Sequence, residues 1–296
     1  MSKLQNIPFP LLKFISRIAS HFPRQILSFR YYRWTKTKLD WKHPRDLQSY
    51  IFSKLIISKY TGEIHVWAEL ADKIRVRDYV TNRAGEKYLT KLYGIWDDPK
   101  DVTFSTLPNS FVLKTNNGCG TNIIIRNGTN KEGEKEDIIN SLKKWLRFPY
   151  GALTGQSHYS LIVPKVLAEE YLEQGGNNNL PYDYKFFCFK GEPKFILYYE
   201  GREVNGHLAN NMVFDLHWNA MPDIVLNPTT HQIPRPRSLD EMIVVVKKLC
   251  RGFDFVRVDL YEINGKPIFG EMTFTPDVLT YFDKSFLDLS NYPELC

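Results

Sequence analysis

Four side chains near the C-terminus have the types and the spacing for phosphoryl chemistry. Arg257 and Asp259 lie two residues apart in an apolar strand pattern, and Glu271 and Thr273 lie two apart at the end of the next one. Side chains alternate along a strand, so each pair shares a face. Two carboxylates that converge across a hairpin repel each other unless a cation lies between them. Mg²⁺ bridging nucleotide phosphates is the usual cation, and Arg257 would then neutralise phosphoryl oxygens.

The turn between these two strand patterns decides whether the four side chains meet. A three-residue turn over Ile263-Asn264-Gly265, with Gly265 left-handed, would place Glu271 and Thr273 on the face of Arg257 and Asp259. A strict two-residue turn would put Glu271 on the opposite face. The proposed site therefore requires the longer turn, and a surface Arg–Asp pair with an unrelated Glu is the alternative.

A second candidate group surrounds a glycine-containing loop. Lys114 ends the strand pattern 111–114, and Asn117-Gly118-Cys119-Gly120 follows. Glycines let the backbone approach a phosphate closely, and a lysine offers a point charge to the same oxygens. The lysine precedes the glycines and no Gly-Lys-Ser/Thr follows, so this is not a Walker loop. A purely structural glycine turn is the alternative.

Acidic residues end a further strand pattern, 166–172. Glu169 and Glu170 lie near its end, and Asp183 follows after a glycine- and asparagine-rich loop. Such carboxylates could accept hydrogen bonds from an adenine amino group or from ribose hydroxyls. Solvated charges at a strand end are the alternative.

From Asp72 onward, strand and helix patterns are mixed. Spacing predicts a helix through Leu142 and a hairpin of strands 184–189 and 194–199 around Gly191. It also predicts a helix that begins at Ser238, with Glu241 placed to complete a capping box. Residues 219–237 are rich in proline and asparagine and are predicted to form a loop.

The positive charge is concentrated at the N-terminus. Residues 1–50 contain ten Lys or Arg but only Asp40 and Asp46, whereas the remainder of the chain has a balance of −2. Apolar residues between Pro10 and Pro23 recur at helical spacing. A basic amphipathic helix of this kind can lie on an anionic membrane surface, or it can pack its apolar face on the main domain. We expect residues 1–70 to form a basic helical region and residues 71–296 the main domain.

Composition excludes several classes of protein. Of the 296 residues, 43% are hydrophobic and 24% charged, which is typical of a globular chain and not of disorder. No apolar run approaches the ~18 residues of a spanning helix. Four cysteines (Cys119, Cys188, Cys250 and Cys296) are widely separated, so we expect reduced thiols and a cytoplasmic protein.

In combination, these segments resemble the ATP-grasp fold, and in detail the TupA-like ATP-grasp family of bacterial surface-polysaccharide gene clusters. The matching pieces are ADKIRVRDYV, FVLKTNNGCGTNIII, AEEYL, DYKFFCFKGEPKFI and GFDFVRVDLYEINGKPIFGEMTF, within residues 71–275. The resemblance implies an α+β chain in which two α/β subdomains clasp ATP, preceded by a basic helical extension.

The resemblance also implies a role for each matching residue. Lys73 and Lys114 would contact ATP phosphates, and Arg257 and Lys114 would be catalytic. The remaining roles are a loop over the phosphates (Asn117, Gly118, Cys119, Gly120), contacts to adenine (Glu169 and the Leu172 backbone) and to ribose (Asp183), further nucleotide-binding residues (Glu170, Tyr171, Lys185) and Mg²⁺ ligands (Asp259, Glu271, Thr273). Thr273 stands where many ATP-grasp ligases have Asn, and Thr is a weaker oxygen ligand.

The predicted function is an ATP-dependent carboxylate–amine ligase that forms an amide through an acyl phosphate. Its substrate would be a uronic acid or amino acid of a bacterial surface polysaccharide or of its precursor, held on a lipid carrier at the inner face of the membrane. The alternatives are a sugar kinase, a glycosyltransferase of the same pathway and a non-catalytic nucleotide-binding scaffold. No nucleic-acid partner is expected, because no nucleic-acid-binding module follows the basic segment.

Overall fold

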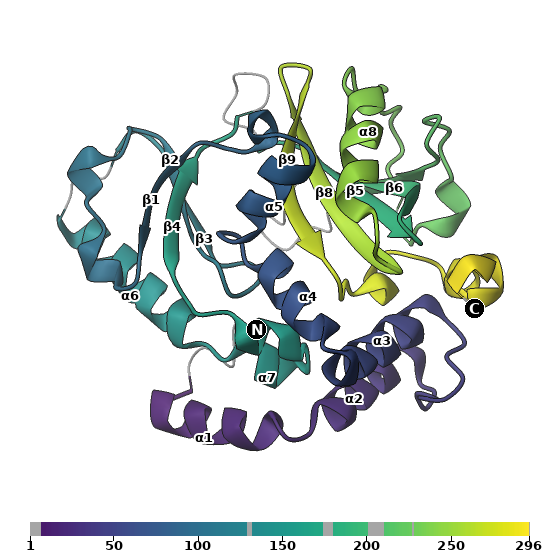
Figure 1. The fold of residues 1–296 in the computed structure, drawn as a ribbon. Coiled ribbons are helices and arrows are strands. Elements are labelled where there is room, and N and C mark those ends of the chain that lie inside the picture. Colours follow the sequence, from purple (N-terminus) through teal and green to yellow (C-terminus); the bar gives the residue numbers. More distant parts are fainter. Residues whose placement is uncertain (1–6, 129–131, 174–179, 201–209, 227, 296) are drawn as a thin grey trace. The chain divides into compact units, whose positions relative to one another are not determined.

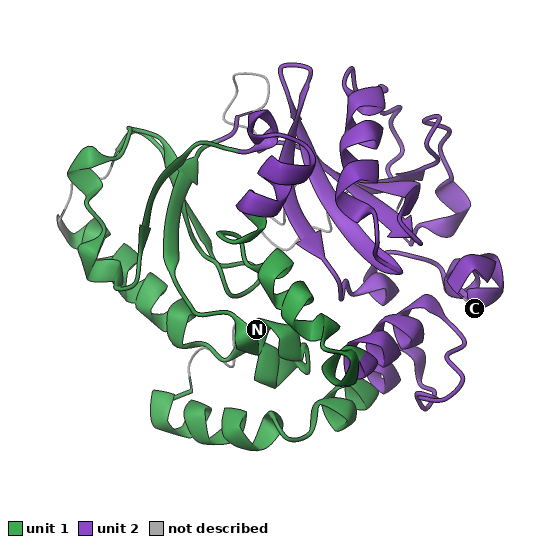
Figure 2. Cartoon of the chain, viewed as in Figure 1, with its two compact units in different colours: residues 1–30, 58–76, 90–171 green, residues 31–57, 77–89, 172–296 purple. Residues whose placement is uncertain are grey.

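The computed structural model describes residues 7–128, 132–173, 180–200, 210–226 and 228–295. Its internal contacts divide the chain into two compact units, coloured separately in Figure 2. Unit 1 comprises Met1–Arg30, Ser58–Val76 and Thr90–Tyr171, and unit 2 comprises Tyr31–Ile57, Arg77–Leu89 and Leu172–Cys296. The division into residues 1–70 and 71–296 stays a prediction.

Unit 1 is built on a four-stranded antiparallel sheet with the strand order β1-β4-β2-β3 (Figure 1). Leu113, Val166 and Ala168 of this sheet form its core together with Leu142 of the predicted helix, α6. The strands and helices of this unit are β1 (Leu92–Trp96), β2 (Phe111–Thr115), β3 (Asn122–Ile125), β4 (Val166–Glu170), α1 (Phe9–Ala19), α4 (Glu63–Ala71), α6 (Glu132–Arg147) and α7 (Tyr150–Thr154).

Unit 2 is built on a five-stranded antiparallel sheet with the order β7-β6-β5-β8-β9. Helix α8 packs on this sheet at β6 and β8. The elements are β5 (Asp183–Phe189), β6 (Glu192–Glu200), β7 (Asn210–Phe214), β8 (Phe255–Ile263), β9 (Lys266–Thr273), α8 (Leu239–Cys250) and α9 (Lys284–Leu287). Helices α2 (Pro23–Thr35), α3 (Leu47–Thr61) and α5 (Val76–Arg83) contain residues of both units.

The centre of the second sheet is strand β5, in which every residue is buried. Its aromatic run predicts this position, because a strand with neighbours on both sides has no solvent face. Phe187 stacks on Phe195 of β6 with ring centroids 4.8 Å apart, and Phe282 meets both rings edge-on. The predicted hairpin around Gly191 is confirmed, and Lys190 and Gly191 both have positive φ, as a tight hairpin turn requires.

The predicted helix at Ser238 is confirmed as α8, but its capping box is wrong. Glu262 of β8 accepts hydrogen bonds from the Ser238 backbone N–H (2.7 Å) and hydroxyl (2.6 Å). Glu241 instead accepts a hydrogen bond from the Tyr88 hydroxyl (2.7 Å). A carboxylate from the sheet thus bonds to the start of the helix, which local sequence spacing cannot reveal.

The α+β class is confirmed by the helices and antiparallel sheets of both units. Within the described residues, none of the helices has the length and apolar character needed to cross a membrane. Cys188 and Cys250 are buried free thiols, Cys119 is exposed, and Cys296 lies outside the described residues.

Candidate ATP-grasp site

The turn between β8 and β9 differs from the prediction. Ile263 pairs with Lys266, so the turn contains two residues, Asn264 and Gly265, with φ of 53° and 73°. Positive φ at both positions is the signature of the type I′ turn that suits two-residue hairpins. The expected three-residue turn is therefore wrong.

A β-bulge restores the predicted arrangement by another route. Leu260 pairs with Phe269 but Asp259 pairs with Glu271, so Gly270 is an extra residue in β9. The extra residue reverses the alternation beyond it. Asp259 then lies opposite Glu271, and Arg257 opposite Thr273.

Glycine at the bulge has a steric reason. A Cβ on residue 270 would lie 3.0 Å from the Asp259 carbonyl oxygen and 3.1 Å from Cε2 of Tyr261. Both distances are tighter than ordinary packing, so a side chain at 270 would push the two strands apart. An isolated glycine inside a strand pattern signals a bulge, and it is the signal the sequence prediction missed.

Arg257 holds the two carboxylates of the hairpin together. Its Nε donates to Asp259 Oδ1 at 2.6 Å, and its Nη2 contacts Asp259 Oδ2 at 2.7 Å and Glu271 Oε1 at 2.8 Å. The Thr273 hydroxyl completes the group by donating to Glu271 Oε1 at 3.1 Å. Two parallel bonds from one guanidinium to one carboxylate fix the planes of both groups.

Strand β5 adds two more charges to this face. Lys185 lies directly opposite Asp259 in the β5–β8 register, and its Nζ lies 2.8 Å from Asp259 Oδ2. The same Nζ is 3.3 Å from Asp183 Oδ1. We call Asp183, Lys185, Arg257, Asp259, Glu271 and Thr273 the charged face of unit 2.

Burial differs sharply between the two candidate metal ligands. The Asp259 side chain is 2% exposed, whereas that of Glu271 is 41% exposed. Burial acts to lower the pKa of Lys185 and of Arg257, but the nearby carboxylates outweigh it and both pKa values are raised. Both cations therefore remain charged, and Glu271 is the carboxylate that a ligand can reach.

In unit 1, the two candidate lysines make separate contacts. Lys114 of β2 forms an ion pair with Glu169 of β4, whose Oε2 also accepts a bond from the Thr90 hydroxyl at 3.4 Å. Lys73 donates to the Gly118 carbonyl oxygen at 2.6 Å, which links it to the candidate phosphate loop. Glu170, on the other face of β4, accepts a bond from the Lys91 backbone N–H at 3.2 Å.

The loop that follows β2 is anchored at its base. The Asn116 side chain accepts from the Lys165 backbone N–H (2.7 Å) and donates to the Val163 carbonyl (3.0 Å). Asn117 is buried and Cys119 is exposed. Gly120 has φ of +71°, a conformation that favours glycine. The Lys73 ammonium group and the backbone of the loop 117–120 therefore lie next to each other.

The predicted site residues thus divide between the two units. Unit 1 contains Lys73, Lys114, the loop 117–120, Glu169, Glu170 and Tyr171, and the charged face belongs to unit 2. The chain passes from one unit to the other between Tyr171 and Leu172. Lys185, which the sequence linked only to nucleotide binding, is a direct partner of the candidate metal ligand Asp259.

The charged face suits Mg²⁺ brought by phosphates better than a metal held by protein alone. Among the described residues, no group of three or more His, Cys, Asp or Glu could hold a metal ion. Mg²⁺ commonly uses one or two carboxylates and takes its other ligands from water and phosphates. Glu271 and Thr273 offer oxygen donors that fit such an ion. Asp259 is the same kind of donor, but both its oxygens pair with Arg257 and Lys185, so it would have to exchange one of these partners for the ion.

A family model described as TupA-like ATPgrasp matches residues 53–290, most of the chain. The chain belongs to the TupA-like ATP-grasp family. This confirms the resemblance carried by the quoted segments, and with it the ATP-grasp fold. No curated protein matches the chain.

Among solved structures, the chain is similar to D-alanine–D-alanine ligase from Bacillus anthracis complexed with ATP (13% identity, TM-score 0.41, 70% of this chain and 56% of that chain). Phosphoribosylamine–glycine ligase from Thermotoga maritima has 13% identity and a TM-score of 0.41, over 70% and 48% of the chains. The ATP-grasp ligase PsnB has 10% identity and a TM-score of 0.39, over 74% and 54%. The chain thus spans about half the length of these structures, and likeness this distant carries no argument about its chemistry.

Proposed function

We propose that this protein is an ATP-dependent carboxylate–amine ligase, with ATP and Mg²⁺ as its cofactors. The observation that carries the proposal is the charged face, where a bulge at Gly270 aligns Asp259, Glu271 and Thr273 around Arg257. Family membership supports the same class of chemistry.

The residues of unit 1 would bind the nucleotide. Lys73 would move from the Gly118 carbonyl, and Lys114 from Glu169, to phosphate oxygens, because among the described residues each ammonium group has a single polar partner that a phosphate can replace. The backbone of the loop 117–120 would lie over the phosphates. Glu169 to Leu172 would meet adenine, and Asp183 with Lys185 would meet the ribose side of the nucleotide.

The charged face would bind the end of ATP that carries the transferring phosphoryl group. Asp259, Glu271 and Thr273 would be the metal ligands, and bound Mg²⁺ would withdraw charge from the phosphoryl oxygens. Arg257, fixed by its bonds to Asp259, would place its guanidinium against the transferring phosphoryl group. Catalysis of this kind depends on positioning and on neutralising charge, so it needs no protein nucleophile.

The reaction has two displacements. A substrate carboxylate oxygen attacks the γ-phosphorus of ATP, and ADP leaves with the bridging oxygen to give an acyl phosphate. An amine then attacks the acyl carbon, inorganic phosphate leaves, and the amine gives up a proton as the amide forms. We propose a uronic acid or an amino acid of a bacterial surface polysaccharide, or of its precursor, as the carboxylate substrate.

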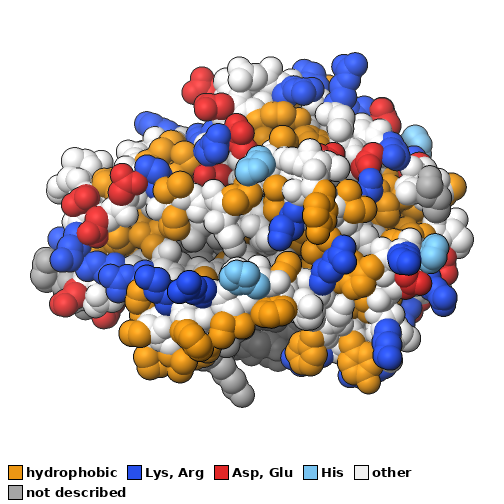
Figure 3. Space-filling view, turned by 60° about the horizontal axis from the view of Figure 1, so that its bottom comes forward, with side chains coloured by type: hydrophobic (Ala, Val, Ile, Leu, Met, Phe, Trp, Pro, Cys, Tyr) orange, Lys and Arg blue, Asp and Glu red, His pale blue; other side chains and the backbone are white. Residues whose placement is uncertain are grey.

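A peripheral position at the inner face of the membrane would suit such a precursor, and α1 supports it. The predicted helix is confirmed, but only part of its apolar surface packs: Leu12 is buried, whereas Leu11, Phe14 and Ile18 are 50%, 62% and 48% exposed. These three side chains, spaced i, i+3 and i+7, form what we call the α1 stripe. In Figure 3, hydrophobic side chains gather along the lower edge, where Figure 1 places α1, with Lys and Arg beside them.

Calorimetric ATP binding with and without Mg²⁺ tests the nucleotide half of the proposal. Glu271→Gln is the informative variant, because this carboxylate is exposed and its loss leaves Arg257 paired with Asp259. Glu192→Gln is its control, since Glu192 lies on β6 and pairs with Lys247 away from the charged face. We expect only Glu271→Gln to weaken Mg²⁺-dependent binding.

Products then decide the reaction class. A ligase should form ADP, phosphate and an amide, and only when a carboxylate and an amine are both present. A phosphorylated sugar would establish a kinase instead, and a preference for a nucleotide sugar would overturn the assignment of the site.

A further inference from the structure

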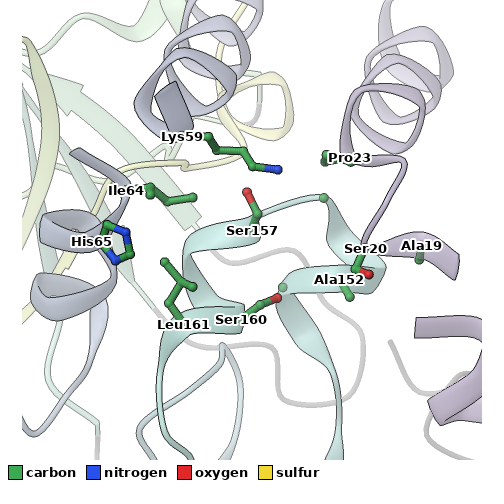
Figure 4. A pocket seen from close by; sticks show the side chains of 12 residues that line it. Ala19, Ser20, Pro23, Lys59, Ile64, His65, Ala152, Ser157, Ser160 and Leu161 are labelled. Carbon is green, nitrogen blue, oxygen red and sulfur yellow. The ribbon is translucent and has the colours of Figure 1, made fainter. Parts of the chain in front are cut away.

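Unit 1 contains a pocket apart from the residues assigned to ATP. Its volume is about 270 Å³, and it lies among the end of α1, the start of α2, the junction of α3 and α4, and the segment from α7 to residue 161 (Figure 4). The lining residues are Ala19, Ser20, Pro23, Lys59, Ile64, His65, Gly151, Ala152, Gly155, Ser157, Ser160 and Leu161. None of them belongs to the candidate nucleotide site.

Several polar side chains of this pocket make no hydrogen bond to any described residue of the protein. Within the described part of the chain, Lys59, His65 and Ser160 have no side-chain hydrogen bond or ion pair. The Ser157 hydroxyl is buried and has no hydrogen-bond partner. Figure 4 shows the Lys59 amine and the Ser157 hydroxyl pointing toward the same space. A buried hydroxyl without a partner is costly, so it is a group that a ligand would satisfy.

The chemistry of the lining favours an anion. A lysine and a histidine contribute, no acidic residue does, and the hydroxyls of Ser157 and Ser160 are donors, whereas the Ser20 hydroxyl donates to the Arg17 carbonyl at 2.8 Å. Ammonium and hydroxyl donors converging on one space match the oxygens of a phosphate. Ile64, Ala152 and Leu161 provide an apolar wall for the carbon atoms of an ester.

The pocket is next to the α1 stripe. Ala19 and Ser20, at the end of α1, line it, and Ile18 of the stripe precedes them directly. Lys13 and Arg17 lie one helical turn apart on α1, and no acidic residue occurs before Asp40. A helix that exposes an apolar stripe beside basic residues is suited to an anionic membrane interface.

We propose that this pocket binds the phosphate of a phosphate ester, with Lys59 and Ser157 as its principal donors. Two sources share this chemistry: a lipid headgroup reached while the α1 stripe lies in the membrane interface, and a soluble phosphate ester. The site is independent of the proposed ligase reaction, because none of its residues is assigned to ATP or to catalysis.

The test uses the full chain without ATP and two kinds of probe. Glycerol 1-phosphate, with glycerol as the blank, is titrated while the imidazole resonances of His65 are followed by NMR. Vesicles of phosphatidylcholine with or without phosphatidylglycerol are used for co-sedimentation. Lys59→Gln is the central variant, and Lys100→Gln is its control, because Lys100 is an exposed lysine of unit 1 outside the pocket.

We expect Lys59→Gln to weaken the binding of a phosphate-bearing probe about tenfold, the loss typical of one charge-assisted hydrogen bond. Lys100→Gln should have no such effect. Ser157→Ala should also weaken binding while leaving the unfolding midpoint unchanged or raised, because the hydroxyl has no protein partner to lose.

The pattern of losses identifies the source. A loss on vesicles containing phosphatidylglycerol assigns the pocket to a lipid headgroup, and a loss with glycerol 1-phosphate alone assigns it to a soluble ester. Equal binding by Lys59→Gln and Lys100→Gln, or no binding of either probe by the unmodified chain, would overturn the proposal. Neither result depends on whether the ligase reaction is correct.

Discussion

The two units of this protein differ in how their titratable side chains are buried and paired. Unit 2 gathers Lys185, Arg257 and Asp259 on one sheet face, buries them, and neutralises each with its neighbours. Unit 1 keeps Lys73 and Lys114 partly accessible in separate contacts. It buries one imidazole, His158, whose ring nitrogens have no hydrogen-bond partner among the described residues.

The difference teaches which residues can be tested by substitution without damage to the fold. A charge held by several buried partners supports the structure as well as the site, so its removal affects both. A lysine with one partly exposed contact can move to a ligand at small cost. The predictions below follow from this contrast, from the largest change in the free energy of unfolding to the smallest.

Asp259→Asn should cause the largest loss of stability, about 3–5 kcal/mol, because it leaves Arg257 and Lys185 buried beside a neutral amide. Urea denaturation of the ligand-free protein measures this change. Glu271→Gln, at an exposed carboxylate of the same face, should cost far less. If the two variants were equally stable, the charged face would not be a structural unit.

His158 should make unit 1 sensitive to acid. Burial lowers its pKa from 6.5 to about 3, so protons bind the unfolded chain more readily than the folded one below pH 6.5. The contribution of neutral His158 to the free energy of unfolding is therefore fully present above pH 6.5. It is lost as the pH drops toward 3, by about 3 kcal/mol between pH 7 and pH 4.

His158→Phe isolates this contribution, because the ring keeps its contacts with Trp67 and Tyr159 but cannot bind a proton. The difference in unfolding free energy between the two proteins should change across this pH range. A difference independent of pH would show that His158 is not buried in its neutral form.

Gly270→Ala should cost about 1–3 kcal/mol, since its Cβ would press on the Asp259 carbonyl and the Tyr261 ring. It should also weaken Mg²⁺-dependent ATP binding, because the bulge sets the position of Glu271. Gly133→Ala on α6 is the control: a Cβ there meets open space, and alanine favours a helix. Unchanged stability and binding in Gly270→Ala would argue against the bulge.

Lys73→Met should have the smallest effect on stability, about 1 kcal/mol, the worth of one hydrogen bond to a carbonyl. Its effect on ATP affinity should be larger, since the ammonium would be a phosphate ligand. Calorimetry beside urea denaturation separates the two effects, with Lys100→Met as the control. A loss of stability without a loss of affinity would remove Lys73 from the proposed site.

Much of the candidate site could be predicted because it depends on local pattern. The apolar runs around Arg257 and Lys114 predict strands, and alternation alone places Arg257 and Asp259 on one face. The quoted segments carry the family resemblance that the family model confirms. The hairpin around Gly191 is also local, since its turn chemistry lies within a few residues.

The remaining features depend on partners distant in sequence. The capping box at Ser238 is wrong because Glu262, on another element, bonds to the start of α8. The periodicity of α1 predicted a helix, but it could not separate Leu12, which packs, from Leu11 and Ile18, which are exposed. Helical spacing identifies an apolar side, whereas the surface that covers it belongs to the rest of the chain.

By itself, the sequence determined the strands that carry the candidate site residues, the family and the residue types available for phosphoryl chemistry. Only the tertiary structure decided that a two-residue turn and a bulge at Gly270 bring Glu271 opposite Asp259, and that Lys185 completes the charged face. The physical reason is that side-chain alternation is a property of one strand. Register and burial are properties of strands in contact, which local spacing does not contain.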